Sequence, residues 1–361
     1  MILYFRGTWL EQMKIEQELK LDFSDVLIRP KRSTLTSRRE VNLEREFIFH
    51  KKSGIVSWLG IPIMASNMDT VGTFEMYSEL SQFKMITCFH KHYTIDDYKL
   101  HKKILNRNYY AISTGITQND YLKLQELIKE LNPMFICIDV ANGYMLAFAD
   151  FVKEISVEYP NLIIICGNVV SREMVEELII NCGADIVKCG IGSGSVCTTR
   201  TQTGVGMPQM SCIIECSDAA HGVNGKIVSD GGCVYPSDVS KAFGGNADFV
   251  MLGSMLAGHH ESGGELIIEN EKQYKLFYGM SSTAAMTKYS GGVAIHRSSE
   301  GKCVKIPYKG YVKQTVQDIL GGIRSTCTYI GAKNIKDMAK CTTFMRVNNQ
   351  INNSLSAFNH M

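Results

Sequence analysis

Several features that would assign this chain to other classes of protein are missing from its sequence. No apolar run within the 361 residues approaches the roughly 20 residues that a membrane-spanning helix needs. A net charge of +2 gives no reason to expect a surface for nucleic acid or anionic lipid. Residues 1–12 contain neither the apolar core nor the small-residue cleavage site of a secretory signal. With 45% hydrophobic and 20% charged residues, the composition is that of a soluble globular protein.

Disulfide and zinc signatures are also missing, although the chain has 12 cysteines. Several of them, such as Cys88, Cys137 and Cys189, lie inside apolar runs. This predicts buried, reduced thiols and a reducing compartment, the cytoplasm. Cys212 and Cys216 form a spaced pair, but no second pair follows at the spacing of a zinc site, so we do not expect a zinc site there.

What the sequence does contain is a repeat of short β-rich apolar runs separated by amphipathic helical stretches. Such strands indicate a parallel sheet covered on both faces, and eight units at a near-constant period predict a (β/α)8 TIM barrel. Two Rossmann halves are the alternative, but the first run lacks the glycine-rich turn of that fold. The expected strands are 62–67, 84–89, 109–113, 134–139, 162–167, 185–189, 226–230 and 248–253.

Beyond the repeat, the sequence predicts a hairpin, a lid loop and a closing helix. Residues 264–279 have the pattern of a hairpin, 280–310 that of a lid loop without regular structure, and 316–324 that of a helix. Met13 is an alternative start, which makes residues 1–12 an extension that is either disordered or foreign to the natural chain. We therefore expect a single domain over 13–347 and a flexible tail over 348–361.

The stretch 190–206, after the sixth run, carries the strongest chemical signal. Four small residues at 192–195 let the backbone approach a ligand closely. Cys197 follows among hydroxyls and beside Arg200, a polar and positively charged setting that favours the thiolate over the thiol. We interpret Cys197 as a nucleophile and this stretch as a catalytic loop.

Polar or small residues end nearly every predicted strand, at the end of the barrel where such enzymes build their active sites. The turns 231–232 and 253–254 offer backbone N–H groups to a phosphate, and 279–281 is a third small-residue turn. Asp230 suits a ribose diol, although it is also placed to cap the following helix. Phosphate, ribose and a nucleophilic thiol together predict a mononucleotide whose base lies over Cys197.

Four motifs of the chain resemble the IMP dehydrogenase/GMP reductase family over residues 19–347. They are Gly-x-Gly-Ser-x-Cys-x-Thr-Arg at 192–200, Asp-Gly-Gly at 230–232, Tyr-Gly-Met-Ser-Ser at 278–282 and Arg-Ser-Ser-Glu-Gly at 297–301. The chain is similar to the reductase branch, because Thr198 follows the cysteine where dehydrogenases usually carry isoleucine. It also lacks the CBS insert and the Arg-Tyr dyad typical of dehydrogenases.

This resemblance implies reductive deamination of GMP to IMP and ammonia with NADPH. A thiolate adding at the purine C2 makes a centre from which ammonia leaves once it is protonated, and the resulting thioimidate accepts hydride. Thr199 has a hydroxyl that can relay the proton, and Glu300 on the lid can supply it. The alternatives are a Thr199 hydroxyl bonded to its own backbone and a solvated Glu300.

The resemblance also implies three sets of binding residues and a homotetramer with the adenosine end of the cofactor near a subunit boundary. The set for the nicotinamide cofactor is Ser37, Arg38, Lys91, Asp139, Val140, Ala141, Ile191, Gly192, Met280, His296, Arg297, Ser325, Thr326, Cys327 and Thr328. The set for GMP or IMP is Ser195, Asp230, Gly231, Gly232, Gly253, Ser254, Gly279, Met280, Ser281, Arg297, Ser298, Ser299, Glu300 and Gly301. The set for a monovalent cation, typically K⁺, is Gly192, Gly194, Cys197 and Arg200. The first three would supply carbonyl oxygens, and the positive side chain of Arg200 would point elsewhere.

The chain departs from the common reductase pattern in three places. Ser193 stands where proline is frequent, Ser254 where glycine is, and His296 where a tyrosine usually stacks on nicotinamide. Lys91 lies between His90 and His92, a pair that also suits a metal but has no third ligand nearby in the sequence. An IMP dehydrogenase and a nucleotide-binding barrel without turnover are the alternative functions.

Overall fold

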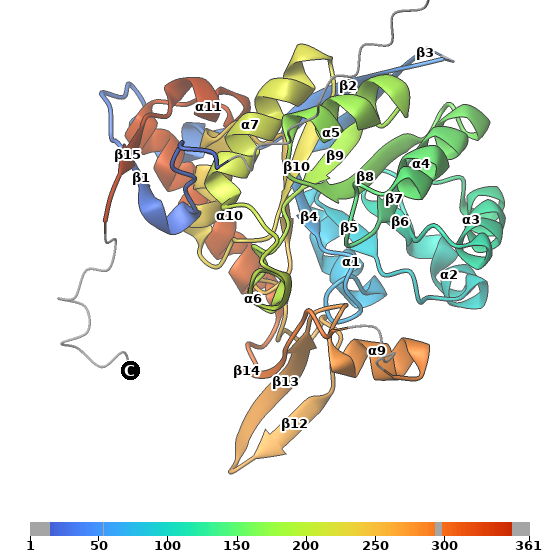
Figure 1. Cartoon of the computed structure of the whole chain (residues 1–361). Coiled ribbons are helices and arrows are strands. Elements are labelled where there is room, and N and C mark those ends of the chain that lie inside the picture. Colours follow the sequence, from blue (N-terminus) through green and yellow to red (C-terminus); the bar gives the residue numbers. More distant parts are fainter. Residues whose placement is uncertain (1–14, 53, 293–297, 349–361) are drawn as a thin grey trace, which may run out of the picture.

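The computed structural model describes residues 15–52, 54–292 and 298–348, which form a closed barrel of eight parallel strands. The barrel order is β10-β11-β4-β5-β6-β7-β8-β9, and Figure 1 shows it in the centre of the molecule. The predicted (β/α)8 barrel and its eight strands are therefore confirmed. Their bounds are Ile63–Ala65 (β4), Ile86–Phe89 (β5), Tyr110–Thr114 (β6), Phe135–Asp139 (β7), Ile163–Val169 (β8), Ile186–Cys189 (β9), Lys226–Asp230 (β10) and Phe249–Leu252 (β11).

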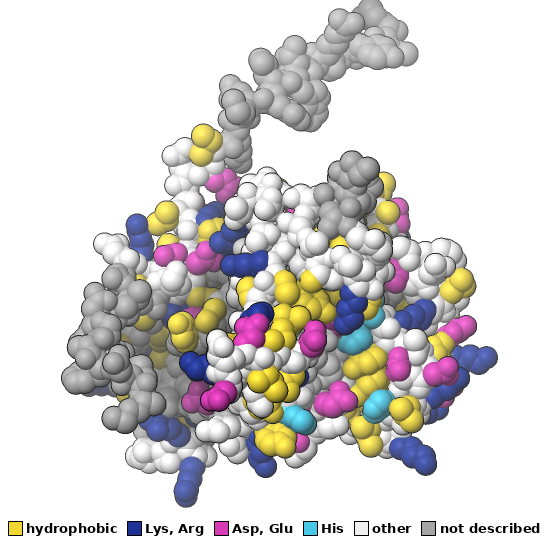
Figure 2. All heavy atoms as spheres, turned by 90° about the horizontal axis from the view of Figure 1, so that it is seen from below, with side chains coloured by type: hydrophobic (Ala, Val, Ile, Leu, Met, Phe, Trp, Pro, Cys, Tyr) yellow, Lys and Arg dark blue, Asp and Glu magenta, His cyan; other side chains and the backbone are white. Residues whose placement is uncertain are grey.

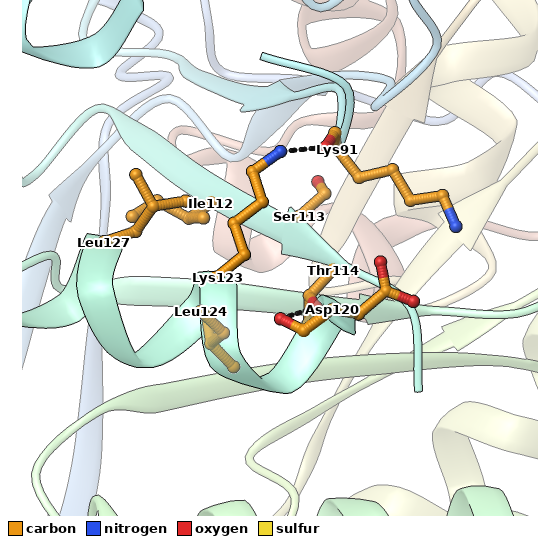
Figure 3. Close-up of a pocket in the computed structure, with 8 residues that line it drawn as sticks. All are labelled: Lys91, Ile112, Ser113, Thr114, Asp120, Lys123, Leu124 and Leu127. Carbon is orange, nitrogen blue, oxygen red and sulfur yellow. Dashed lines mark hydrogen bonds between the residues drawn. The ribbon is translucent and has the colours of Figure 1, made fainter. Parts of the chain in front are cut away.

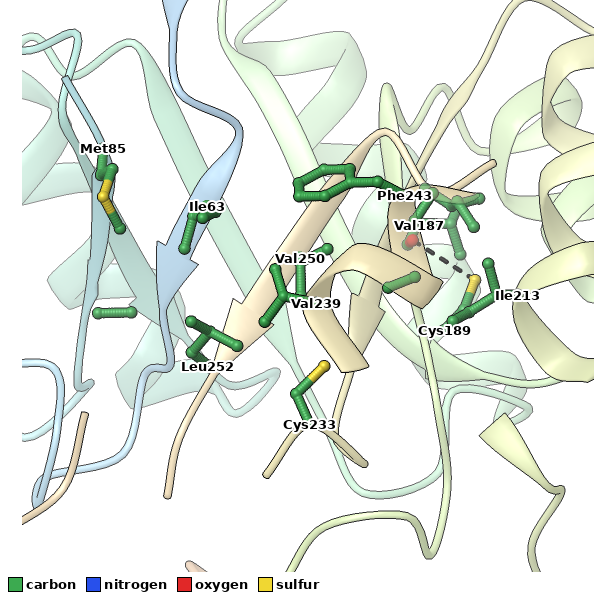
Figure 4. Packing of buried hydrophobic residues seen from close by; sticks show 14 of the residues in the cluster. Ile63, Met85, Val187, Cys189, Ile213, Cys233, Val239, Phe243, Val250 and Leu252 are labelled. Atoms are coloured by element: carbon green, nitrogen blue, oxygen red, sulfur yellow. Dashed lines mark hydrogen bonds between the residues drawn. The ribbon is translucent and has the colours of Figure 1, made fainter. Parts of the chain in front are cut away.

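Helices cover the outer face of the barrel and bury its apolar side chains. Figure 4 shows part of this layer, where Ile63, Val187 and Val250 of the strands face Ile213 and Phe243 of two helices. Such a covered sheet explains why the strands read as continuous apolar runs. The helices are Phe74–Leu80 (α1), Ile95–His101 (α2), Gln118–Leu131 (α3), Leu146–Glu158 (α4), Arg172–Glu176 (α5, continued by the π-helical η5 at Glu177–Asn181), Gln209–Gly222 (α7), Pro236–Gly244 (α8) and Val312–Ile330 (α10).

A hairpin that the sequence did not reveal closes the N-terminal end of the barrel. Strands β2 (Arg45–Lys51) and β3 (Gly54–Gly60) pair antiparallel and place Phe47, Phe49 and Trp58 against the barrel interior. The segment reads as polar because exposed residues alternate with these buried ones. The smaller elements at this end and on the flank are Phe23–Asp25 (η1), Val26–Ile28 (β1), Arg38–Glu40 (η2), Ser81–Phe83 (η3), Lys102–Ile104 (η4), Ile335–Asp337 (η6), Met338–Cys341 (α11) and Phe344–Arg346 (β15).

The predicted hairpin after strand eight is confirmed, as β12 (Leu266–Glu269) and β13 (Lys272–Tyr278). The prediction of a lid without regular structure over 280–310 is wrong. Thr283–Ser290 form the helix α9, and Cys303–Pro307 form β14, which pairs with β13 as a third strand. The Gly-, Ser- and Lys-rich composition hid both, because α9 depends on the Ser282 cap and β14 on its partner strand. This sheet projects beneath the barrel in Figure 1.

Two further predictions concern the ends of the chain. The predicted helix at 316–324 is present but extends over α10, so 325–328 lie inside this helix and not after it as expected. The extension 1–12 and the tail from 349 onward lie outside the described residues. No described helix is long and apolar enough to span a membrane.

Candidate active site

The loop that carries Cys197 connects β9 to α7 and contains the short helix α6 (Thr199–Thr203). The Cys197 N–H donates to the Gly194 carbonyl at 3.0 Å, which closes a tight turn just before the cysteine. Its side chain is half-buried, and its thiol donates to the Thr199 hydroxyl at 3.2 Å. The predicted nucleophile therefore faces the polar end of the barrel and not the packed core.

A segment that we call the strap, residues 298–302, lies along this loop. The Thr198 N–H donates to the Glu300 carbonyl at 2.8 Å, and the Lys302 N–H donates to the Val196 carbonyl at 3.0 Å. These two hydrogen bonds flank an isolated antiparallel bridge between Cys197 and Gly301. The strap is thus fixed to the nucleophile loop through its main chain.

Glycine is needed where the strap meets the turn at 279–281. A Cβ on Gly301 would lie 3.2 Å from the Gly279 Cα, and one on Gly279 would lie 3.3 Å from the Gly301 Cα. The Glu300 N–H donates to the Ser281 carbonyl at 3.1 Å. Strap, turn and loop therefore form one packed unit of backbone.

This packing brings the three predicted catalytic residues together. The Thr199 hydroxyl accepts from the Cys197 thiol and donates to the Glu300 carboxylate at 2.8 Å. Thr199 is therefore not bonded to its own turn, and Glu300 is not a solvated charge, as the two alternatives required. The result is a continuous hydrogen-bonded path from a thiol to a carboxylate, suited to moving a proton between them.

Arg200 occupies a different place from the one the sequence suggested. Its guanidinium forms an ion pair with Asp22 at 2.9 Å and donates to the Met207 carbonyl at 2.5 Å. The positive charge that the sequence predicted beside Cys197 is thus paired with the Asp22 carboxylate. The Arg200 stem packs against Gly192, while its guanidinium points to Asp22 and Met207.

Three charged side chains lie at the C-terminal ends of neighbouring strands. Lys188 of β9 is buried, and its ammonium lies 2.5 Å from an Asp139 oxygen and 3.3 Å from an Asp230 oxygen. Burial favours neutral lysine, but the two carboxylates outweigh it and raise the pKa of Lys188 well above its usual value. Lys188 therefore links the predicted cofactor residue Asp139 to the predicted substrate residue Asp230.

The carboxylate of Asp230 also accepts from the Asn168 amide at 2.8 Å. It does not cap the following helix, since Asp238 accepts from the Val234 and Tyr235 N–H groups there. No motif in the sequence marks Lys188. A lysine inside an otherwise apolar strand could have indicated its role, because a buried charge requires partners of opposite charge.

The predicted phosphate turn at 231–232 lies next to the cysteine loop, whereas the turn at 253–254 lies beside Ser66. Gly231 and Gly232 have φ angles of 93° and 82°, and a Cβ on Gly231 would lie 2.4 Å from the Ser193 Oγ. Ser193, one of the departures from the family pattern, donates to the Asp230 carbonyl at 3.2 Å and so joins the two loops. The Ser66 hydroxyl, at 3.4 Å from a Cβ on Gly253, is buried and has no hydrogen-bond partner among the described residues. Bare backbone and an unpaired hydroxyl suit a polar ligand.

The strap serines contact helices on both sides. Ser298 donates to Gln202 of α6 at 3.3 Å, and Ser299 accepts from the Thr283 N–H at 3.1 Å. Ser195 is exposed at the tip of the loop, and the Ser254 carbonyl accepts from Lys309. Figure 2 looks onto this end of the molecule and shows basic, acidic and histidine side chains around a hydrophobic patch.

The predicted cofactor residues fall into two groups. Lys91, 139–141 and 191–192 lie at the C-terminal ends of barrel strands, and Met280 follows β13 of the projecting sheet. Ser37 and Arg38 lie at η2, which packs on α10, the helix that contains 325–328. This second group lies on the flank of the barrel and not at its mouth (Figure 1). His296 and Arg297 lie outside the described residues.

Lys91 borders a small cavity between β6 and α3 (Figure 3). The Lys123 ammonium donates to the Lys91 carbonyl at 2.6 Å, while the Lys91 ammonium lies near Gly115, as does the Asp120 carboxylate. The cavity has room for about one water molecule, so it is no binding site for a nucleotide.

The histidines on either side of Lys91 are held by aromatic rings. His90 stacks on Tyr93 and His92 on Tyr289, with ring centroids 3.9 and 3.4 Å apart, and burial lowers the pKa of each to about 4. Within the described residues, no group of three or more His, Cys, Asp or Glu side chains is placed to hold a metal ion. All 12 cysteines are free thiols, including Cys212 and Cys216.

Helix α9 is tied to the barrel beside these rings. The buried Asp69 carboxylate accepts from the hydroxyls of Tyr278 and Tyr289 at 2.6 Å each and from Lys288 at 2.9 Å. Burial alone would raise the pKa of Asp69, but these three donors lower it below its usual value. The start of the segment that leads to the strap is therefore anchored by an ionised carboxylate.

Comparison with known proteins gives results over nearly the whole chain. A sequence model of the IMP dehydrogenase / GMP reductase domain matches residues 20–354. A GMP reductase of Caenorhabditis elegans is 56% identical over 96% of this chain and 97% of its own length. Human GMP reductase 1 is 55% identical over 95% of this chain and 99% of its own length, and a GMP reductase of Ascaris suum is 53% identical over 96% of this chain and 98% of its own.

Proposed function

The chain belongs to the IMP dehydrogenase / GMP reductase family, and we propose that it catalyses the NADPH-dependent reductive deamination of GMP to IMP and ammonia. The observation that carries the proposal is the hydrogen-bonded path from Cys197 through Thr199 to Glu300. A reductive deamination needs both a nucleophile and a proton for the departing amine. This path provides both from adjacent groups.

The path balances the protons of the first half-reaction. As the Cys197 sulfur bonds to the purine C2, its proton passes to the Thr199 hydroxyl, whose own proton passes to the Glu300 carboxylate. The same route in reverse delivers one proton to the C2 amine, and ammonia leaves as the C–N bond breaks. A thioimidate between Cys197 and C2 results, and Glu300 is again ionised.

The second half-reaction releases the enzyme. NADPH, when bound, supplies the hydride that C2 receives. Cys197 then leaves C2 as a thiolate, the transferred hydride remains on C2 as its hydrogen in IMP, and one proton from solvent restores the Cys197 thiol. Splitting one difficult substitution into two easier steps is the gain from a covalent intermediate.

The substrate is proposed to bind with its phosphate on the glycine turns at 231–232 and 253–254 and its ribose at Asp230. The unpaired buried hydroxyl of Ser66 and the close contact of Gly231 with Ser193 support this position. NADPH is proposed to lie along Asp139 and Lys91, with the Lys91 ammonium as the charge-assisted partner of a phosphate at the adenosine end.

Potassium and a homotetramer complete the proposal. The carbonyls of Gly192, Gly194 and Cys197 are hard oxygen donors on a loop whose Gly192 has a φ of 78°, a donor set that suits a monovalent cation. Replacing potassium by sodium should slow turnover, and equal rates would remove the cation from the proposal. The separation of Ser37, Arg38 and 325–328 from the mouth supports a cofactor shared between subunits, with a tetramer expected in light scattering. The 12 free thiols support a cytoplasmic location.

The test is a single assay with two readouts. Purified protein receives GMP and NADPH in potassium buffer, and NADPH absorbance and released ammonia are followed together. We expect one ammonia for each NADPH consumed. Rapid formation of XMP from IMP and NAD⁺ would instead establish a dehydrogenase, and GMP binding without NADPH consumption would establish a barrel that only binds nucleotides.

A further inference from the structure

The side chain of Arg200 fills the space between the two ends of the catalytic loop. A Cβ on Gly192 would lie 2.5 Å from the Arg200 Cγ, and a Cβ on Gly206 would lie 2.7 Å from the same atom. Both glycines also have positive φ angles, at 78° and 155°. The arginine stem therefore packs against both ends of the loop that carries Cys197.

One carboxylate from the N-terminal segment holds the other end of Arg200. An Asp22 oxygen lies 2.9 Å from the Arg200 Nη1, and the other Asp22 oxygen accepts from the Gln209 N–H at 2.5 Å. Gln209 is the first residue of α7. Asp22 therefore bonds at once to the helix that bears Thr199 and to the helix that follows the loop.

The segment that carries Asp22 is itself fixed to α7. Leu21 exchanges hydrogen bonds with Ser211, at 2.8 Å to its hydroxyl and 3.0 Å from its N–H, and the Lys20 ammonium contacts Glu215. The Asp22 N–H donates to the Asp25 carboxylate at 2.8 Å. The carboxylate of Asp22 is thus presented from a rigid support, 178 residues away from Arg200 in sequence.

A consequence for chemistry comes from the neighbours of Arg200. Thr199 precedes it directly in α6, and the Gly204 N–H donates to the Arg200 carbonyl at 3.1 Å. The relay of Thr199 to Glu300 spans 2.8 Å, so a shift of the helix by a fraction of an ångström changes it. The Arg200 Nε is buried without a hydrogen-bond partner among the described residues, so the clamp from Asp22 and Met207 falls on the two Nη atoms.

We infer that Asp22 is a positioning residue for the reaction: through Arg200 it fixes the catalytic loop so that Cys197, Thr199 and Glu300 stay in hydrogen-bonded register. The kinetic part of this inference rests on the proposed function, whereas its structural part does not. Asp22 touches neither the reacting atoms nor the residues proposed to hold GMP. It acts on the rate of the chemical steps and not on nucleotide affinity.

The experiment compares Asp22→Asn with the unaltered chain in two measurements. Steady-state kinetics with GMP and NADPH should show kcat lowered by about 10- to 100-fold, as expected for a displaced catalytic group, with the KM for GMP changed far less. Hydrogen exchange followed by mass spectrometry should show faster exchange in the peptide over 190–207. The second measurement needs no turnover, so it tests the clamp even if the proposed reaction is wrong.

Two controls separate the clamp from general loosening of the N-terminal segment. Glu215→Gln removes the contact to Lys20 on the same segment but leaves Asp22 and Arg200 paired, so kcat and loop exchange should stay at their normal values. Asp22→Asn and Arg200→Gln each break the same ion pair between these two residues. The double variant should therefore be no slower than the slower of the two single variants.

Asp22→Glu keeps the charge on a longer stem and should fall between Asp22→Asn and the unaltered chain in both measurements. If Asp22→Asn does not fold, Asp22→Glu is measured in its place. The inference is overturned if Asp22→Asn has normal kcat and normal loop exchange, if Glu215→Gln is equally impaired, or if the losses of the two single variants multiply in the double variant.

Discussion

The two ends of the barrel are built from the same strands, but one end is packed with apolar side chains and the other carries the charged residues of the candidate site. Along β9, Ile186 and Lys188 project from the same face, since side chains alternate in a strand, and along β10 Val228 and Asp230 do so. Ile186 and Val228 belong to the apolar cluster at the N-terminal end, whereas Lys188 and Asp230 form the charged group at the other end. Within two residues of each strand the interior changes from packed hydrocarbon to paired charges.

The closed end supplies stability that the open end lacks. Phe47 of the hairpin stacks on Phe249 with centroids 4.4 Å apart, and Trp58 meets Phe135 edge-on at 6.3 Å. The open end holds glycines at positive φ and the unpaired hydroxyl of Ser66, none of which stabilises a fold. An active site with bare backbone is therefore kept in shape by a core placed elsewhere on the same strands.

Cys197→Ala should abolish the reaction at the open end without affecting the closed end. Loss of a covalent nucleophile costs about 10⁴-fold or more in kcat. NADPH consumption in the presence of GMP is the measurement, and GMP binding by calorimetry together with the melting temperature should be unchanged. Retained turnover would exclude thioimidate chemistry.

Glu300→Gln should remove the proton source while keeping the strap in place, because its contacts to the loop are made by backbone. Ammonia release should fall by about 10²- to 10⁴-fold, whereas hydride transfer from IMP to NADP⁺ should fall less. Equal losses in the two assays would argue against the relay. Glu269→Gln, on the projecting sheet, is the matched control and should leave both rates unchanged.

Trp58→Ala should produce the converse result at the closed end. The side chain is 2% exposed and donates to the Asn108 carbonyl at 2.6 Å, so its removal should lower the free energy of unfolding by about 3–5 kcal/mol. Chemical denaturation measures this loss, and kcat of the folded fraction should be normal. Leu59→Ala, at an exposed position of the same strand, should change stability by less than about 0.5 kcal/mol. A collapse of kcat in folded Trp58→Ala would show that the two ends are not independent.

His90, which follows β5 at the open end, should make stability depend on pH. Burial lowers its pKa from 6.5 to about 4, so between these values the unfolded chain binds a proton that the folded chain does not. Stability should therefore fall as the pH drops from 6.5 toward 4, by about 2 kcal/mol from this residue. Denaturation across this range should show a smaller loss in His90→Gln, whereas the exposed His50→Gln should keep the full loss. An equal loss in His90→Gln and the unaltered chain would remove His90 as the cause.

Most of the barrel could be predicted from the sequence because its strands are continuous apolar runs bounded by polar residues, as at Phe135–Asp139. The hairpin at 45–60 could not, because its buried residues alternate with exposed ones and pack on strands distant in sequence. Helix α9 and strand β14 escaped for a related reason. Each is held by tertiary partners, such as Asp69 for α9, and not by local apolar periodicity.

The candidate site divides in the same way. Cys197, Thr199 and Glu300 were identifiable because motifs mark them, and the structure brings them within hydrogen-bonding distance. Lys188 and Asp22 carry no motif, and their roles come from contacts with residues up to 178 positions away. The sequence also suggested that the Arg200 charge lies beside the thiol, but this charge pairs with Asp22. Adjacency in sequence does not give the direction of a long side chain.

The main-chain hydrogen bonds between the strap and the nucleophile loop bear on how such proteins diversify. Bonds between Thr198 and Glu300 and between Lys302 and Val196 make no demand on the side chains involved. Point substitutions at 298–300 can therefore change the side chains beside Cys197 while these main-chain hydrogen bonds persist. The position of the loop is thus set separately from the side chains that the strap presents to it.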